Sequence, residues 1–158
     1  MNLSKNFTLT ELTKTSYPYD NTPPENYIRT LMLLCVYILQ PIRDVMGAIL
    51  VSSGYRGPEV NKAVKSKPTS QHAIAEAADI QFPGYGGNRV HEVFRWIIFE
   101  SGIKFGQCIL EHKSSRGVWW IHISLPRPYR ENQESFMIID GVKKDYSPEE
   151  VEGFLSYE

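Results

Sequence analysis

Two β-rich runs joined by a polar turn constrain the fold of this chain most strongly. They cover residues 107–112 and 118–125, and both are rich in β-branched and aromatic residues. Two such runs separated by a short turn predict an antiparallel hairpin. Side chains alternate along a strand, so His122 should lie on the face opposite to Ile121 and Ile123. The sequence therefore predicts a hairpin with one apolar face toward the core and a histidine on the other face.

Helical and strand-like segments surround this hairpin. Predicted helices comprise a short one opened by a Thr8–Glu11 capping box, a long one from Pro24 to Gly47 kinked at Pro41, one from Pro58 to about Lys65, one capped by Asn88 and stopped by Gly102, and one starting at Ser147. Predicted strands comprise residues 49–52, 77–81, and a second hairpin, 136–139 and 142–146, with a type I′ turn at Asp140-Gly141. This order predicts an α+β fold, a small and mainly antiparallel sheet flanked by helices.

The bulk properties fit one globular domain over residues 1–158. A hydrophobic content of 42% and a charged content of 22% are ordinary for such a domain. The formal net charge of −1 gives no general attraction to polyanions, so we expect no nucleic-acid partner. Two cysteines are too few for a disulfide framework, and Cys35 and Cys108 are predicted to be buried free thiols.

The sequence also predicts no membrane span. The longest apolar run, near residues 31–39, is too short to cross a bilayer. The first residues lack the apolar segment of a secretory signal, so we expect the protein to stay in the cytoplasm where it is made. We also expect it to be a monomer. If it acts on a cell wall, release from the cell or delivery in a virion must bring it there.

Three residues suggest a metal site. His72 and Asp79 lie seven residues apart in the stretch 52–80, and His122 lies on the polar face of the predicted hairpin. Two imidazoles and one carboxylate suit a catalytic zinc site, which uses three protein ligands and leaves a position for water. A structural zinc site would more often be closed by cysteines.

The motifs around these residues resemble a known family. Ser-Gly-Tyr-Arg at 53–56, Ser-x-His-x6-Asp at 70–79 and Trp-x-His-x-Ser at 120–124 look like the M15 zinc peptidases. These are D-Ala-D-Ala carboxypeptidases and related cell-wall peptidases, including phage endolysins. The resemblance extends to residues 7–12 and 21–24, and so covers roughly residues 4 to 125.

The resemblance implies that His72, Asp79 and His122 bind zinc and that Arg56 contacts the substrate. A fixed guanidinium also suits this role chemically, because it pairs with a carboxylate or a developing oxyanion. The alternative for Arg56 is a salt bridge to a helix terminus. Ser70 matches the family's serine and would donate a hydrogen bond to substrate, or would serve only as a turn residue. Ala75 stands where the family usually has glycine.

A zinc peptidase also needs a general base, usually a carboxylate. Some family members carry glutamate three residues before the last histidine, where this chain has Trp119. Glu111 is the better candidate here and Glu76 the weaker one. We expect Glu111 to pair opposite Val118, which places it on the His122 face; its alternative is a solvent-exposed charge at a strand end.

The other two histidines are expected to lie outside the site. His112 should face the opposite side of its strand from Glu111, as a structural or exposed residue. His91, in the first turn of the helix after Asn88, is predicted to lie on the surface.

The predicted function is zinc-dependent hydrolysis of peptide bonds in peptidoglycan stem peptides, by a carboxypeptidase or endopeptidase with its zinc cleft on one sheet face. Zinc would lower the pKa of a bound water to roughly 7, and Glu111 would take its proton. Two alternatives remain: a non-catalytic cell-wall-binding module that keeps the fold, with or without the metal, and a phage tail-associated protein. The absence of glutamate at position 119 is the main support for the first.

Overall fold

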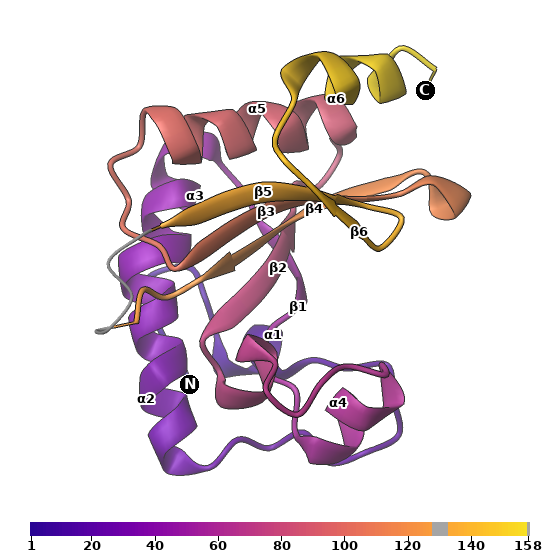
Figure 1. The fold of residues 1–158 in the computed structure, drawn as a ribbon. Helices are drawn as coiled ribbons and strands as arrows, with labels where there is room; N and C mark the ends of the chain where they lie inside the picture. The colour runs from indigo at the N-terminus through magenta and orange to yellow at the C-terminus, as the bar shows by residue number, and fades with distance from the viewer. Residues whose placement is uncertain (128–132, 158) are drawn as a thin grey trace. The chain divides into compact units, whose positions relative to one another are not determined.

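The computed structural model describes residues 1–127 and 133–157 (Figure 1). They form helices and one open, mostly antiparallel sheet of six strands in the order β1-β2-β4-β3-β5-β6. The predicted α+β class with a mainly antiparallel sheet is confirmed. Within these residues, no helix has the length and apolar character needed to cross a bilayer.

The chain divides into two compact units. The first comprises residues 1–47 and 51–79, and the second comprises residues 48–50 and 80–158. One boundary follows Gly47, and the other two fall within strands β1 (Leu50–Ser53) and β2 (Ala77–Gln81). Each unit is described in turn.

The first unit opens with a capped helix, α1 (Leu9–Thr13). The Thr8 hydroxyl accepts from the backbone of Glu11, and the Glu11 carboxylate accepts from the backbone of Thr8, so the predicted capping box is confirmed. Phe7 and Leu12 on either side of it are buried. The cap fixes where the chain turns into the helix.

The long helix of the first unit runs in three parts, α2 (Glu25–Leu34), a π-helical segment (Cys35–Leu39) and α3 (Gln40–Met46). Pro41 lacks the N–H that would bond the carbonyl four residues earlier, and its ring crowds that carbonyl. The turn before it widens, with the Gln40 N–H bonded to the Cys35 carbonyl, so the irregularity predicted at Pro41 takes the form of a π-bulge. Gly47, with φ of 89°, ends the helix as predicted.

The rest of the first unit carries short elements that hold the functional residues. They are β1, α4 (Pro58–Ala63), the 3-10 helix η2 (Gln71–Ile74) and the start of β2. Apolar side chains of α2 and the π-helical segment supply much of the buried core, including Leu31, Leu34, Ile38 and Leu39. Cys35 is buried and free, and burial raises the pKa of its thiol to about 12.

The second unit is built on strands β3 (Gln107–Lys113), β4 (Val118–Ser124), β5 (Glu134–Ile139) and β6 (Val142–Lys144). Helix α5 (Gly87–Phe99) packs on β3 and β4, and α6 (Pro148–Leu155) contacts α5 (Figure 1). β5 pairs with β3 in parallel and with β6 antiparallel. Cys108, a free thiol as predicted, is fully buried in β3, which raises its pKa.

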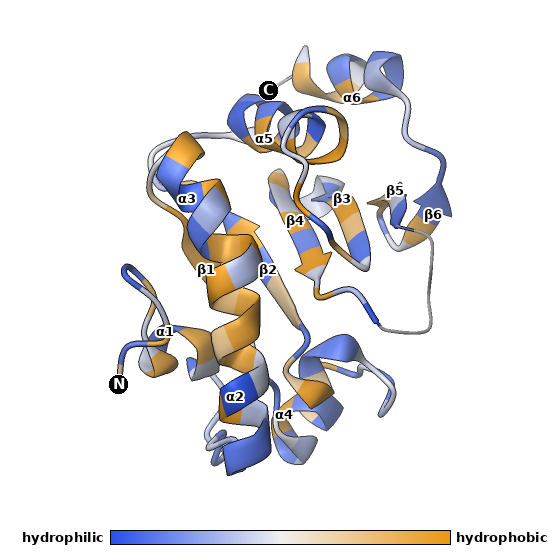
Figure 2. Cartoon of the chain, turned by 90° about the vertical axis from the view of Figure 1, so that its left-hand side faces the viewer, coloured by the Kyte–Doolittle hydropathy of each residue, from blue (hydrophilic) through white to orange (hydrophobic). Residues whose placement is uncertain are grey.

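The β3–β4 hairpin is confirmed, but its predicted register is wrong by two residues. Glu111 pairs with Trp120, while Val118 pairs with Lys113. The strands extend further and the turn is tighter than expected, a 3-10 turn (Ser114–Arg116) closed by Gly117 with φ of 62°. Because a shift of two residues keeps every side chain on its face, Glu111 still shares the His122 face. Figure 2 shows the alternation along β4 as orange and blue bands.

Of two further predictions of local structure, a turn between β5 and β6 and a helix cap, the first is confirmed and the second is wrong. Asp140 and Gly141 both have positive φ, at 50° and 80°, which agrees with the predicted type I′ turn between β5 and β6. The predicted cap at Asn88 is wrong, because α5 already begins at Gly87. A Cβ at Gly87 would lie 2.5 Å from Trp119, so this helix start is set by close packing on β4.

Candidate metal centre

His72 and Asp79 form a close pair in the first unit. His72 Nε2 lies 3.3 Å from Asp79 Oδ1, and the two side chains are 3% and 17% exposed. His72 lies on η2, and Asp79 follows the fully buried Ala77 and Ala78 on β2. The small residues before Asp79 allow β2 to pack closely and carry the carboxylate to the imidazole.

The local chain geometry places His72. The Ser70 hydroxyl caps η2 by accepting from the His72 backbone N–H at 3.3 Å. Ala75 ends η2 in the left-handed conformation, with φ of 62° and ψ of 19°. That region favours glycine, and here alanine adopts it. The backbone thus reverses between His72 and β2 within a few residues.

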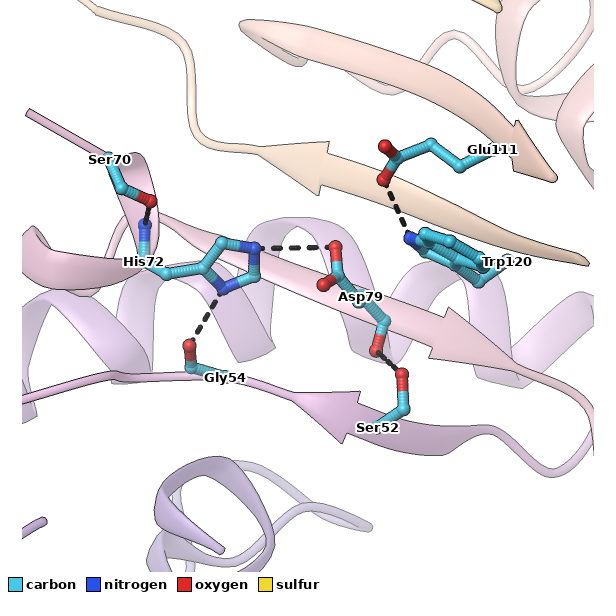
Figure 3. A network of polar contacts seen from close by, with 7 residues as sticks. All are labelled: Ser52, Gly54, Ser70, His72, Asp79, Glu111 and Trp120. Atoms are coloured by element: carbon cyan, nitrogen blue, oxygen red, sulfur yellow. Dashed lines mark hydrogen bonds and ion pairs between the residues drawn. The ribbon is translucent and has the colours of Figure 1, made fainter. Parts of the chain in front are cut away.

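A backbone carbonyl fixes the tautomer of His72 (Figure 3). His72 Nδ1 lies 2.8 Å from the carbonyl oxygen of Gly54. A carbonyl only accepts, so Nδ1 carries the proton and donates it. When Nδ1 is the protonated nitrogen of a neutral imidazole, Nε2 presents its lone pair toward Asp79. Metal-ligating histidines almost always donate their second ring nitrogen in this way.

His72 Nε2 and Asp79 Oδ1 can lie this close only if a positive charge lies between them. A neutral imidazole with its proton on Nδ1 places a lone pair against a carboxylate oxygen, and two such acceptors repel unless a proton or a metal ion binds both. Ligand atoms at the usual zinc distances, arranged tetrahedrally, are about 3.3–3.5 Å apart. The observed 3.3 Å therefore fits two neighbouring ligands of one zinc ion. The donor set, nitrogen and oxygen, also suits zinc.

Strand β2, which carries Asp79, is hydrogen-bonded to β1 at Asp79 itself. The Ser52 hydroxyl donates to the Asp79 carbonyl at 3.3 Å (Figure 3). The Arg56 backbone N–H donates to the His72 carbonyl at 3.0 Å. These contacts connect the segment 52–56 to both members of the pair, to Asp79 through the Ser52 side chain and to His72 through the Arg56 backbone.

In the second unit, His122 and Glu111 lie on one face of the β3–β4 hairpin. Glu111 is directly opposite Trp120, and His122 is two residues further along β4. Trp120 Nε1 donates to Glu111 Oε2 at 2.6 Å, which fixes the carboxylate (Figure 3). Glu111 and His122 are both half-buried. Glu111 is therefore a positioned carboxylate on the histidine face, as the sequence predicts, rather than a loose strand-end charge.

His72 and Asp79 of the first unit and His122 of the second make up the group of candidate metal ligands, each with one ligand atom to offer. Sequence reasoning selected the same three residues. It missed two supports: the Gly54 carbonyl behind His72, and the Trp120 indole behind Glu111. The first was signalled only by the glycine of the motif, and the second only by the tryptophan two residues before His122.

The remaining candidates lie as follows. His112 is buried, donates from Nδ1 to the Val118 carbonyl, and stacks on Trp119 at 4.0 Å between centroids, so its predicted structural role is confirmed. The prediction that His91 lies on the surface is wrong: it is buried, with Nε2 2.6 Å from the Tyr146 hydroxyl. Glu76 is half-buried on the chain reversal before β2.

Trp119 occupies the position where the resemblance offers a glutamate. Its ring is 3% exposed and stacks on His112, on the face of β4 opposite to His122. A carboxylate at position 119 of this chain would therefore be directed into the apolar layer under α5. The lack of glutamate there does not remove a base from the His122 face.

Comparison with known protein families identifies the family of this chain. A family model described as Peptidase M15 matches residues 5–124, which include the Ser-Gly-Tyr-Arg motif and all three histidine and aspartate residues of the group. No curated protein matches the chain.

Proposed function

The chain belongs to the peptidase M15 family, and from this premise we propose that it is a zinc-dependent peptidase that cleaves stem peptides of bacterial peptidoglycan. The observation that carries the proposal is the His72–Asp79 pair, in which a Gly54 carbonyl fixes the imidazole so that its other nitrogen meets a carboxylate at 3.3 Å. Such a pair is built to bind a cation. The zinc cleft on one sheet face remains part of this proposal.

His72, Asp79 and His122 would hold the metal. Zinc, when bound, supplies Lewis-acid chemistry that acidifies a water molecule and polarises a carbonyl group. One carboxylate among the ligands partly neutralises the charge of the ion. His72 contributes Nε2, and the Gly54 carbonyl accepts from Nδ1 and so holds the ring in the orientation that a metal ligand needs.

Glu111 is the general base of this proposal. It accepts a proton from the attacking water and returns it to the amine that leaves as the peptide bond breaks. The Trp120 indole N–H donates to one of its oxygens, Oε2, and so orients the carboxylate. An indole N–H is neutral, so it orients the carboxylate without competing for its proton.

Arg56 and Ser70 are the proposed substrate contacts. The Arg56 backbone N–H donates to the His72 carbonyl, so Arg56 is attached at its backbone to a residue of the metal pair. A guanidinium binds a carbonyl or carboxylate oxygen of the peptide and stabilises the charge that develops there. The Ser70 hydroxyl accepts from the His72 backbone and retains its own proton to donate to the substrate.

Glu111→Gln tests the enzymatic role. We expect zinc content equal to that of the wild type, because Glu111 is not a ligand, and release of peptides from purified peptidoglycan lowered by at least about a hundredfold, the usual range for loss of a general base. Glu76→Gln is the matched control and should cleave at the wild-type rate. Zinc binding without cleavage in the wild type would contradict the proposal and favour a cell-wall-binding module.

A further inference from the structure

A cavity of about 730 Å³ lies in the first unit, beside the residues that position the metal pair. This volume is within the range of small-ligand sites. Its lining includes Tyr55 and Arg56, which follow Gly54, and Ala73 and Ile74, which follow His72. Residues 54–56 and 72–74 therefore both position the metal pair and form part of the cavity wall.

The charged residues that line this cavity are all basic. Lys62 and Lys65 line it together with Arg56, and none of its lining residues is acidic. Tyr27 and Tyr55, with ring centroids 5.8 Å apart, and the prolines Pro58 and Pro68 supply apolar walls. A ligand that fits must carry negative charge on a partly apolar body.

Asn61 adds a requirement that a bare anion does not meet. Its side chain is 4% exposed and lines the cavity, and Nδ2 donates to the Lys67 carbonyl at 3.0 Å. Since that carbonyl can only accept, the orientation of the amide is fixed and Oδ1 is the remaining atom. Oδ1 is buried and has no hydrogen-bond partner among the described residues. A buried acceptor of this kind is costly unless a ligand brings an N–H group to it.

The backbone at Lys65 also indicates that its side chain matters. Lys65 follows α4 with φ of 57°, in the left-handed region that commonly holds glycine after a helix. A side chain there strains the backbone. From this position Lys65 lines the cavity.

We infer that this cavity is a subsite for a carboxylate that lies next to an amide N–H, such as an acidic residue within a substrate peptide. Lys62 and Lys65 bind the carboxylate, Asn61 Oδ1 accepts from the amide, and the tyrosine and proline walls contact the alkyl chain. The inference rests on the proposed function, because it makes the cavity an extension of the peptidase substrate site.

Binding of N-acetylglutamate to the zinc-loaded full chain tests the subsite. Nuclear magnetic resonance should show saturable shifts at the Asn61 side-chain amide and the Ile74 methyl groups. The neutral N-acetylglutamine amide and inorganic phosphate should bind much more weakly, because the first lacks the charge and the second lacks the N–H donor. Equal binding by phosphate would contradict the assignment to a peptide.

A double variant, Lys62→Ala with Lys65→Gly, tests the residues. Glycine relieves the backbone at position 65, so the variant should fold at least as stably as the wild type while its affinity for N-acetylglutamate falls about tenfold or more. Lys67→Ala, an exposed lysine that does not line the cavity, is the control and should bind normally. Unchanged affinity in the double variant would overturn the inference.

The cleavage assay separates this inference from the proposed function. If the double variant loses affinity only for peptides that carry a free carboxylate, with a higher KM and an unchanged kcat, both hold. If the wild type binds N-acetylglutamate as predicted but cleaves no peptidoglycan, the subsite holds and the proposed function fails. If cleavage is normal and KM for acidic peptides does not change in the double variant, the subsite fails and the proposed function holds.

Discussion

Gly54→Ala should weaken both the fold and the metal site, for one steric reason. A Cβ at Gly54 would lie 2.3 Å from the backbone oxygen of Leu12 and 2.9 Å from its carbonyl carbon. Ordinary contacts to a Cβ begin near 3.4 Å, so one of the two backbones must move by about an ångström. Backbone atoms cannot rotate aside as the end of a flexible side chain can, and overpacking of this kind costs about 1–3 kcal/mol of unfolding free energy.

The same movement should disturb zinc binding. The Gly54 carbonyl accepts from His72 Nδ1 at 2.8 Å, and the next residue, Tyr55, donates its N–H to the Leu12 carbonyl at 2.8 Å. A shift of about an ångström breaks one or both of these bonds. Loss of a group that orients a metal-ligating histidine typically lowers metal affinity by about 10–100-fold. We therefore expect a drop of this size although no ligand has changed.

Chelator competition and thermal unfolding measure the two effects. Gly153→Ala is the control: a Cβ there meets nothing within 4 Å, and alanine in the interior of α6 should leave zinc affinity unchanged and stabilise the protein by up to about 1 kcal/mol. A Gly54→Ala protein with wild-type melting temperature and zinc affinity would refute the argument. Loss of stability with normal zinc affinity would refute its second step, in which Gly54 fixes His72.

Two further predictions concern the second unit. Trp120→Phe removes the N–H that Glu111 accepts, so kcat should fall about tenfold and its acidic pH limb should shift while zinc content stays the same; a kcat and pH profile equal to the wild type would show that the indole does not position the base. His91→Gln should reduce the acid sensitivity of folding. Burial, with the nearby Arg95, lowers the pKa of His91 in the folded state, so the unfolded chain binds more protons below its pKa of about 6.5; the contribution is present above that pH and is lost as the pH falls. Urea unfolding at pH 7.5 and 5.5 should show a smaller loss of stability in the variant than in the wild type, and equal losses would contradict this.

Local signals predicted local structure well. The Thr8–Glu11 capping box and the Asp140-Gly141 turn depend on residues within a few positions of one another, and both are present. The start of α5 at Gly87 was not predictable in this way. It depends on close approach to Trp119 and Leu155, which are distant in the sequence.

The hairpin shows which part of a strand prediction is secure. Alternation determined that Glu111 and His122 share a face, and this parity is unaffected by a register shift of two residues. The register itself depends on the turn, where Gly117 in the left-handed region closes a tighter loop than the polar composition suggests. His91 was predicted to lie on the surface, and this prediction failed because its partner, Tyr146, is 55 residues away in the sequence and no local pattern indicates the contact.

The candidate site was predictable in its residues and not in its supports. Motif spacing selected His72, Asp79 and His122, because chemistry restricts which side chains bind zinc. The Gly54 carbonyl that fixes His72 is a backbone group, and any residue type carries one. Only the folded structure shows which carbonyl accepts the hydrogen bond from His72.

Metal analysis of the wild type and of His122→Ala tests the central claim most directly, namely that a histidine of the second unit completes the zinc site begun by His72 and Asp79. We expect about one zinc per chain in the wild type by mass spectrometry, and a large loss in His122→Ala with a folded chain. His112→Gln, on the opposite face of the same hairpin, should retain zinc. Full zinc content in His122→Ala, or none in the wild type after reconstitution, would contradict the account.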